Sequence, residues 1–533
     1  MFVTSSLLEI LGANPRAVWS LIIGLVIYSF VRYIRSPLRH LPPGPPGVPI
    51  WGNKALLGKT QFKLFSRLSE TYGPIIHLNN AGKHIVVLNS VKVTTDILER
   101  RAGIYSDRPN NIVGAEMMCG GNSLVFQHTG DRWRRMRKAA HEALRKDVIK
   151  QYQHAQWKES ILLTSSLLKS GPQEWQSQIK RAAASGLLGL VYDMEPIKSM
   201  EEPQVVHIDG FMRRITKSTR PGAHLVESWP WMRHIPTQFA AWKKRALDSF
   251  ASDSAAFGAL FDHARQKLLS GDHTSSFAAT LIKDSERNKL SDLENSWLAS
   301  TIYAAGSDTT SSIMSWWVLA MTAHPEFQKK AQEEIDRVVG RDRLPTLDDM
   351  TSLPYVQATI RETARWRPPA PIGVPHRSTE DDWYEGHFIP KNSTVIVNIW
   401  NLNRDTSIFG PDVDVYNPER FLNETSELAP SASESKDMGH FSFGFGRRIC
   451  VARYMAENVM FVYAASMLWA LNFEAGKDEK GQTTPPNIQD MIEEGLVIRP
   501  PNFNCVASPR FPETITMLEQ VKEDLDLKKY IHL

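Results

Sequence analysis

Cysteine is scarce in this 533-residue chain, which contains only Cys119, Cys450 and Cys505. Three cysteines cannot build a disulfide framework, a four-cysteine zinc site or a four-cysteine iron–sulfur cluster. An excess of one charge is also missing, because 62 basic residues stand against 58 acidic ones and leave a formal net charge of +4. This balance indicates that nucleic acid is not the main partner.

The sequence also lacks the bias of fibrous or disordered proteins. Its 31 glycines and 32 prolines are close to average usage, which excludes a collagen-like or low-complexity chain. Hydrophobic residues make up 42% of the chain and charged residues 23%. That is enough apolar surface to offset the entropy of ordering the chain, so a folded globular body is expected.

One apolar run stands out near the N-terminus. Residues 17–31 carry no charge, and the run reaches Ile34 if the side chain of Arg32 extends toward the headgroups. Arg32, Arg35 and Arg39 follow it, whereas Arg16 alone precedes it, so the positive-inside rule places the rest of the chain in the cytosol. The sequence therefore predicts a single-pass membrane anchor in residues 1–39, with the span at about 17–34; a buried or interfacial helix is the alternative.

The proline-rich stretch 40–50 (HLPPGPPGVPI) predicts a stiff, extended hinge after the anchor. Beyond it, residues 51–533 are predicted to form one large domain that is mainly α with small β-sheets. Residues 75–90 alternate around a turn and predict a hairpin, residues 131–340 are mostly helical in pattern, and residues 383–400 predict further strands.

The strongest chemical motif is the stretch 443–452 (FGFGRRICVA), which leads into an apolar helical run. Cys450 is therefore expected at a helix N-terminus, where the macrodipole and free N–H groups stabilise a thiolate. The glycines would allow close approach to a flat cofactor, and Arg448 could pair with an anionic group on it. For a lone cysteine the alternative is a buried residue at a tight loop-to-helix turn.

This stretch resembles the haem loop of the cytochrome P450 superfamily, Phe-x-x-Gly-x-Arg-x-Cys-x-Gly. Phe443, Gly446, Arg448 and Cys450 match it at the right spacing, whereas Ala452 replaces the usual glycine. The resemblance implies the cytochrome P450 fold, haem b as the cofactor, and Cys450 as the axial thiolate ligand of its iron. Because alanine is the smallest replacement, we expect tighter helix–haem packing and not lost binding.

A second motif, Glu362-Thr-Ala-Arg365, resembles the Glu-x-x-Arg pair of the same family. Pro354 fits the first position of a helix and Pro368 stops it, so Glu362 and Arg365 share one helix face. Taken alone, this is an ordinary surface ion pair. The resemblance implies a buried structural triad, completed by Arg420, that fixes the haem-loop region.

The third motif is residues 305–310 (AGSDTT), inside a helix predicted over about 287–320. Small and polar residues in an apolar helix are locally costly, and their hydroxyls can bond back to the preceding turn. The plain alternative is a kink without chemistry. The resemblance implies an oxygen-activation groove in which Asp308 and Thr309 relay protons.

The fourth motif, Trp133-Arg-Arg-Met-Arg137, resembles the Trp-x-x-x-Arg helix of the family. It implies that Trp133 and Arg137 bind a haem propionate, and His376 matches a frequent propionate ligand of microsomal members. The basic residues around Trp133 could form a docking face for a reductase or a solvated helix face. These residues are Arg132, Arg134, Arg135 and Lys138.

The resemblance covers nearly the whole chain and is strongest to microsomal fungal enzymes of secondary metabolism, of the O-methylsterigmatocystin oxidoreductase type. It implies a monooxygenase that hydroxylates a hydrophobic small molecule, for which we favour a terpenoid. Electrons would come from NADPH through NADPH–cytochrome P450 reductase, with cytochrome b5 as an optional partner, at the endoplasmic reticulum membrane. Two alternatives are a haem-thiolate isomerase or dehydratase and a non-catalytic haem-binding protein. Trp229 and Trp231 could dip into the bilayer or pack in the core.

Overall fold

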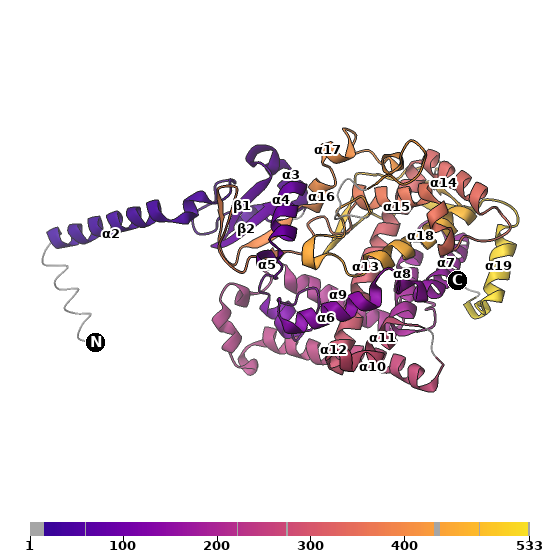
Figure 1. The fold of residues 1–533 in the computed structure, drawn as a ribbon, viewed down its shortest axis with the longest axis horizontal. Coiled ribbons are helices and arrows are strands. Elements are labelled where there is room, and N and C mark those ends of the chain that lie inside the picture. Colours follow the sequence, from indigo (N-terminus) through magenta and orange to yellow (C-terminus); the bar gives the residue numbers. More distant parts are fainter. Residues whose placement is uncertain are drawn as a thin grey trace.

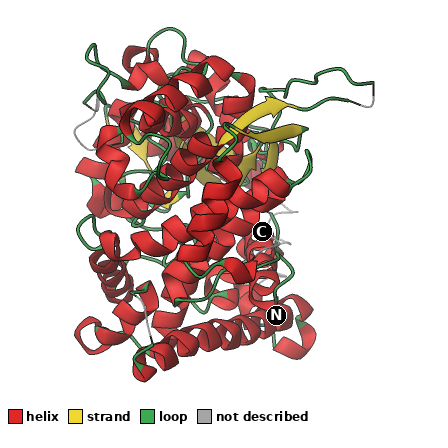
Figure 2. Ribbon diagram, turned by 90° about the vertical axis from the view of Figure 1, so that its right-hand side faces the viewer, coloured by secondary structure: helices red, strands yellow, loops and turns green. Residues whose placement is uncertain are grey.

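Helices make up most of the fold in the computed structural model, which describes residues 15–58, 60–220, 222–272, 275–430, 438–478 and 480–530 (Figure 1; Figure 2). The helical stretch predicted between 131 and 340 is confirmed. The helices are α2 (Pro15–Arg35), α3 (Gln61–Tyr72), α4 (Val91–Thr95), α5 (Ala102–Tyr105), α6 (Asp131–Leu144), α7 (Gln153–Lys169), α8 (Trp175–Tyr192), α9 (Pro203–Thr219), α10 (Ala241–Ser270), α11 (Phe277–Lys283), α12 (Ser285–Asn288), α13 (Asp292–Ala323), α14 (Pro325–Val338), α15 (Pro354–Trp366), α16 (Ile399–Leu402), α17 (Thr406–Phe409), α18 (Arg453–Ala470) and α19 (Thr514–Asp524).

The strands form small sheets, as the sequence predicts. The four-stranded sheet has the order β1-β2-β6-β3, in which the predicted hairpin supplies β1 and β2 and the parallel neighbour β6 comes from far along the chain. Three two-stranded sheets pair β4 with β5, β7 with β10 and β8 with β9. The strands are β1 (Ile75–Asn80), β2 (Lys83–Leu88), β3 (His376–Arg377), β4 (Asp382–Tyr384), β5 (His387–Ile389), β6 (Thr394–Val397), β7 (Leu471–Ala475), β8 (Ile492–Glu494), β9 (Val497–Arg499) and β10 (Cys505–Pro509).

Helix α13 runs through the core and packs against α8, α10, α15 and α18. It begins at Asp292, several residues later than predicted, because Ser291 and Glu294 form a capping box that fixes its first turn. Gly306 lets α8 approach closely, since a Cβ atom at this position would lie 2.3 Å from Leu187 Cδ1. Trp316 and Trp317, two buried tryptophans of α13, anchor the helix in the largest hydrophobic cluster of the described residues.

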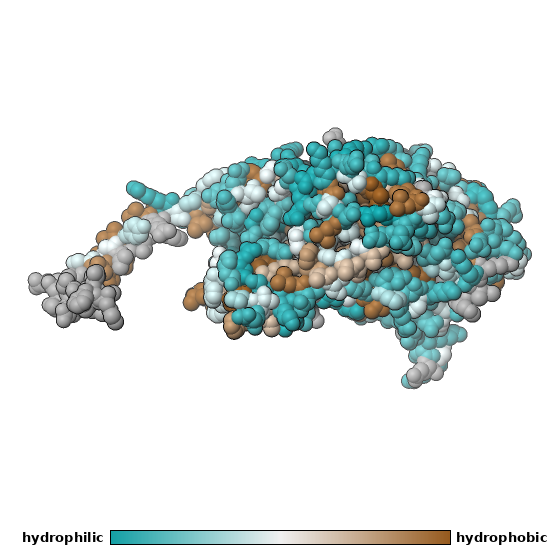
Figure 3. Space-filling view, turned by 90° about the horizontal axis from the view of Figure 1, so that it is seen from below, coloured by the Kyte–Doolittle hydropathy of each residue, from teal (hydrophilic) through white to brown (hydrophobic). Residues whose placement is uncertain are grey.

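The N-terminal helix α2 projects away from the body (Figure 1). Its hydrophobic side chains are exposed, for example 64% of Trp19 and 61% of Phe30, and Figure 3 shows this brown surface on the projecting arm. In the described part of the chain, no helix combines the length and the apolarity needed to cross a membrane. The single-pass span predicted at 17–34 is therefore not supported.

The proline-rich stretch lies along the open edge of β1. The backbone N–H of His77 donates to the Pro43 carbonyl at 2.9 Å, and the N–H of Asn53 donates to the Asn79 carbonyl at 2.5 Å. Gly44 fits only as glycine, because a Cβ atom would lie 2.0 Å from the His77 carbonyl oxygen. Backbone contacts therefore hold this segment against the sheet and cover its edge.

Candidate active site

The loop before Cys450 is a tight turn that glycine makes possible. Residues Gly446–Arg448 form a 3-10 turn, and the Cys450 N–H donates to the Phe443 carbonyl at 2.8 Å across it. Gly446 has φ +56°, and a Cβ atom there would lie 2.0 Å from the Leu98 carbonyl oxygen. The motif glycine is thus required both by its backbone conformation and by the close approach of residues 96–100.

Cys450 lies just before the first turn of α18, so the predicted position at a helix N-terminus is confirmed. Burial raises the pKa of the Cys450 thiol, while the backbone N–H of Ala452 and the guanidinium groups of Arg137 and Arg453 lower it. This setting can stabilise the deprotonated sulfur of Cys450 when a metal ion binds to it. Cys119 and Cys505 are both buried, and burial raises the pKa of Cys505 to about 11.

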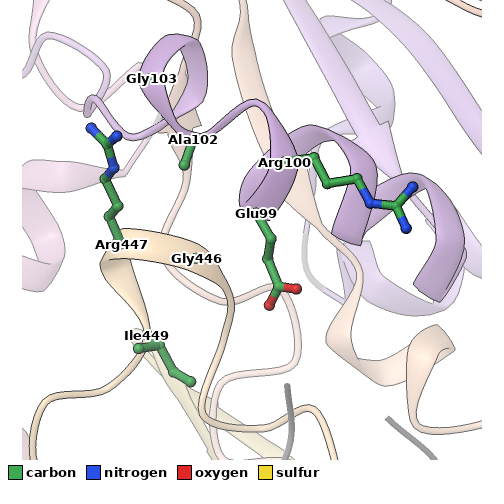
Figure 4. Close-up of a pocket in the computed structure, with 7 residues that line it drawn as sticks. All are labelled: Glu99, Arg100, Ala102, Gly103, Gly446, Arg447 and Ile449. Carbon is green, nitrogen blue, oxygen red and sulfur yellow. The ribbon is translucent and has the colours of Figure 1, made fainter. Parts of the chain in front are cut away.

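A shallow pocket of about 450 Å³ borders the cysteine loop. Glu99 and Arg100 line one wall, and Gly446, Arg447 and Ile449 line the other (Figure 4). Arg447 is exposed, and its side chain in Figure 4 extends toward the turn of Ala102 and Gly103. The pocket thus places exposed basic groups beside the backbone that leads to the sulfur.

Three arginines converge behind this loop. Arg137 of α6 donates to the Ile449 carbonyl at 2.5 Å, and Arg448 donates to the carbonyls of Ser106 and Gln127 at 2.8 and 2.6 Å. Arg108 donates to the Val374 carbonyl at 2.7 Å. Burial, together with the charges of Arg108 and Arg137, lowers the pKa of Arg448 to about 8. Burial and the charge of Arg137 likewise lower the pKa of Arg108 to about 9. Each of the three positive charges therefore destabilises the charged form of its neighbours.

Trp133 and His376 complete this group. Trp133 is buried beneath Arg448, and its indole Nε1 has no hydrogen-bond partner among the described residues. His376 Nδ1 lies 2.8 Å from the Tyr105 carbonyl oxygen, so this nitrogen donates. Burial, followed by the charges of Arg108 and Arg448, lowers the pKa of His376 well below its usual value. The neutral ring then offers only an acceptor at Nε2, and it can donate to a carboxylate only when protonated.

These residues fit the carboxylate side chains of a haem. Asp107 is the acidic group that balances the cluster, but Arg377, His128 and the Thr129 N–H already engage it. Arg108 is buried and Arg137 and Arg448 are half-buried, so positive charge is concentrated here. Together with the Trp133 indole N–H, which has no partner among the described residues, this charge calls for further anionic oxygens. Cys450 stands on the adjacent loop, in the position of a single sulfur ligand. Sequence reasoning missed Arg108, whose only signal is a basic residue before Pro109 at the start of a loop.

The oxygen-groove motif lies in the middle of α13. Thr309 Oγ1 donates to the Ala305 carbonyl at 2.8 Å, which is the predicted back-bonding to the preceding turn. Asp308 instead forms an ion pair with Arg499 of β9. Sequence reasoning missed this partner. No local sequence motif joins positions 308 and 499, which lie 191 residues apart.

The Glu-x-x-Arg motif is in the core and not on the surface. Glu362 and Arg365 are fully buried and bonded through two contacts of 2.6 and 2.7 Å. Arg420 reaches Glu362 at 3.2 Å, so the structure brings the predicted triad together. Arg365 also donates to the carbonyls of Asn403 and Val413, which ties α15 to the segment before the cysteine loop.

Two surface features bear on predicted partners. On α6, Arg134 and Lys138 are exposed, and each has an acidic neighbour on the same helix, Asp131 and Glu142. Trp229 and Trp231 are 53% and 66% exposed, so the alternative that they pack in the core is wrong. Pro230–His234 forms a 3-10 turn without buried residues, which leaves both indoles on the surface.

Comparisons with known proteins agree with this site. The family model described as cytochrome P450 matches residues 42–506. The chain is 49% identical over 516 residues to a cytochrome P450 monooxygenase of Armillaria gallica, covering 97% of this chain and 99% of the relative. It is 41% identical over 511 residues to cytochrome P450 monooxygenase 58 of Postia placenta, covering 96% of each. It is 35% identical over 532 residues to cytochrome P450 monooxygenase iboC of Amanita muscaria, covering 91% and 94%.

Membership of this family implies haem b, with electrons from NADPH delivered through a reductase. The donor set of the site fits that cofactor: a sulfur on one loop lies beside three clustered arginines and an indole N–H that has no partner among the described residues. Family model, relatives and site chemistry lead to one conclusion: the chain belongs to the cytochrome P450 family and is a haem-thiolate monooxygenase.

Proposed function

We propose that Cys450 is the sulfur ligand of the haem iron and that the buried cluster binds the haem propionates. Arg108, Arg137 and Arg448 would supply the positive charge, and Trp133 would donate its Nε1–H. The observation that carries this assignment is the indole N–H of Trp133, which is buried beneath Arg448 and has no hydrogen-bond partner in the described part of the chain. His376 would join as a donor once a propionate favours its protonated form. Phe443 and Gly446 would shape the loop that presents the sulfur.

When bound, the haem supplies the activation of dioxygen and the insertion of one oxygen atom into the substrate. The part of the protein in this chemistry is to deliver protons and exclude water. We assign the proton relay to Asp308 and Thr309. The Thr309 hydroxyl already donates to the Ala305 carbonyl, so it can pass a proton along the groove by rotating away from that bond.

This relay also weighs against the alternatives. An isomerase or dehydratase on the same fold has no need for protons at dioxygen, and a non-catalytic haem protein has no need for a relay at all. Asp308 and Thr309 stand together in the middle of α13, and that arrangement favours the monooxygenase. Glu362, Arg365 and Arg420 have a structural role in this scheme, because they are bonded to one another and to backbone carbonyls in the protein core.

The substrate is proposed to be a hydrophobic small molecule of fungal secondary metabolism, with a terpenoid as the favoured class. The segments that resemble the substrate contacts of the family are largely apolar, namely 112–126, 303–305, 370–374 and 495–497. The relatives reported above all come from fungi, which supports the biological setting.

We propose that the enzyme associates with the endoplasmic reticulum membrane and keeps its body in the cytosol. The exposed apolar side chains of α2 and the exposed Trp229 and Trp231 support contact with lipid. NADPH–cytochrome P450 reductase would dock beside the cysteine loop, where Arg447 and Arg100 are exposed and α6 contacts the loop through Arg137. Cytochrome b5 would use the same basic face.

The function is tested with the full-length protein expressed in yeast. Cys450→Ala should lose the carbon monoxide difference spectrum of thiolate-ligated haem, whereas Cys119→Ala and Cys505→Ala should retain it. Thr309→Ala should keep that spectrum but divert electrons from NADPH to hydrogen peroxide. Normal coupling in Thr309→Ala would reject the relay. Product analysis by mass spectrometry, with terpenoid, polyketide and indole scaffolds supplied to the yeast, then identifies the substrate class.

A further inference from the structure

The ion pair between Asp308 and Arg499 joins two elements that the sequence does not connect. Arg499 is the last residue of β9 and is 5% exposed at its side chain. Its guanidinium group pairs with the Asp308 carboxylate, donates to the Asp308 carbonyl at 3.3 Å and donates to Ser311 Oγ at 2.7 Å. A buried arginine with three partners on one helix turn is held in one place.

Strand β9 is itself fixed to α13. The Ile498 carbonyl accepts hydrogen bonds from Ser312 Oγ at 2.7 Å and from Trp316 Nε1 at 3.1 Å. On its other side, the Ile498 N–H donates to the Pro369 carbonyl at 2.9 Å. The backbone next to Arg499 is therefore held by α13 and by the segment after α15, so the guanidinium group is presented by a rigid support.

Asp308 and Thr309 do not point in the same direction. Adjacent residues of an α-helix are rotated by about 100° around its axis. Asp308, Ser311 and Ser312 mark the side that faces β9, because all three bond to residues of that strand. Thr309 Oγ1 bonds instead to the Ala305 carbonyl of its own helix. To give a proton to Thr309, the Asp308 carboxylate must leave Arg499.

We infer that Arg499 is a positioning residue, which holds the Asp308 carboxylate on the β9 side of α13 and so determines when the proton relay begins. The inference rests on the proposed relay role of Asp308 and Thr309. It assigns to strand β9 a part in proton delivery that the motifs of α13 do not contain. Arg499 acts through Asp308 alone, so its replacement should matter only while Asp308 is present.

The first experiment measures thermal unfolding of the haem-loaded holoenzyme, which does not depend on turnover. The variants are Arg499→Ala, Asp308→Asn and the double variant. Each single change leaves one charged or polar partner uncompensated, so the double variant should unfold at a higher temperature than the sum of the two single shifts predicts. Additive shifts would show that the pair does not form in the holoenzyme, and would overturn the inference.

The second experiment measures the hydrogen peroxide released per NADPH consumed. The holoenzyme is reconstituted with NADPH–cytochrome P450 reductase, and 7-ethoxycoumarin is added as the apolar probe. Arg499→Ala should raise the peroxide share about threefold or more, because the carboxylate is then released from the β9 side before the relay should begin, and proton delivery is no longer timed. Arg499→Lys keeps the charge and should restore most of the coupling. In the double variant the peroxide share should equal that of Asp308→Asn alone.

Ser311→Ala is the matched control, since it removes one hydrogen bond from Arg499 but leaves the ion pair, and it should behave as wild type. The carbon monoxide spectrum verifies haem loading in every variant. If Asp308→Asn itself leaves consumption and coupling unchanged, the relay and this inference both fail. If Asp308→Asn is impaired but Arg499→Ala equals wild type, or Arg499→Ala has its full effect without Asp308, only this inference fails.

Discussion

The guanidinium carbon of Arg448 lies 4.2 Å from the centre of the Trp133 ring, so an arginine two residues before Cys450 covers an indole of α6. Both residues come from motifs that the sequence places more than three hundred positions apart. Their stacking brings two separate motifs together, and the indole N–H of Trp133 at this contact has no acceptor among the residues that the structure describes.

Trp133→Phe keeps an aromatic ring under Arg448 and removes only the N–H. A hydrogen bond to a charged group contributes about 1.5–3 kcal/mol, so the affinity for haem should fall about tenfold or more. Haem transfer to apomyoglobin measures this loss. Trp175→Phe is the control, because Trp175 is a buried indole that donates to the Phe503 carbonyl at 2.9 Å, outside the site. An unchanged affinity in Trp133→Phe would reject the propionate assignment.

Gly446→Ala should give little haem-loaded protein. Its Cβ atom would collide with the Leu98 carbonyl oxygen at 2.0 Å, and backbone atoms cannot yield as a flexible side chain can. Gly444→Ala is the matched control: φ is +80° there, but nothing lies within 4 Å of the added atom. Strain alone costs about 1–3 kcal/mol, so Gly444→Ala should lower the unfolding temperature and still bind haem. Equal haem yields from the two variants would contradict the close-approach argument.

Arg365→Ala should destabilise the protein by about 3–5 kcal/mol, because it leaves Glu362 charged and buried. Thermal unfolding and the yield of carbon monoxide-reactive protein measure the effect. Arg343→Ala removes an ion pair of similar geometry, in which the Arg343 guanidinium lies 2.7 Å from the Asp349 carboxylate. The Arg343 side chain is 51% exposed. That control should cost at most about 1 kcal/mol. Similar losses in the two variants would mean that burial of the triad does not determine its contribution.

The titration of His77 should account for part of the loss of folding stability at acidic pH. Its Nε2 lies 2.9 Å from His84 Nδ1, and burial followed by the charge of His84 lowers the pKa of His77 to about 4. Because the unfolded chain binds the proton more readily, the contribution of His77 is complete above its usual pKa of 6.5 and is lost as the pH falls toward 4. The loss amounts to about 3 kcal/mol at most.

His77→Gln removes that titration while keeping an amide donor toward His84. Its unfolding temperature should therefore fall less than that of wild type between neutral pH and about pH 5. His263→Gln, a change at an exposed position of α10, should leave the acid-induced fall unaltered. A wild-type response in His77→Gln would place the acid sensitivity elsewhere.

Residues in motifs with fixed spacing could be predicted from the sequence, and isolated residues could not. Some residues stand at helix or loop spacings that match motifs of the family: Cys450, Glu362 with Arg365, and Trp133 with Arg137. Arg108 and Arg499 are lone arginines, and their roles depend on contacts between distant segments that no local pattern encodes.

The predicted starts of two helices differ in how well they agree with the structure. Pro354 marked the start of α15 in the sequence and begins it in the structure. The start of α13 was predicted too early, because the capping box at Ser291 overrides the helical pattern that precedes it. The apolar run at the N-terminus did form a helix, α2, although no helix in the described part of the chain is long and apolar enough to cross a membrane.

The backbone bonds along β1 have a practical consequence for making a shortened enzyme. A chain that starts at Leu41 would keep the Pro43 carbonyl on His77 and the turn through Gly52, so the sheet would stay covered. A chain that starts at Trp51, where the proline pattern ends, would strip that cover and leave unpaired amides open to neighbouring molecules in concentrated solution. A shortened chain should therefore begin before Pro43, so that the carbonyl bonded to the sheet is kept.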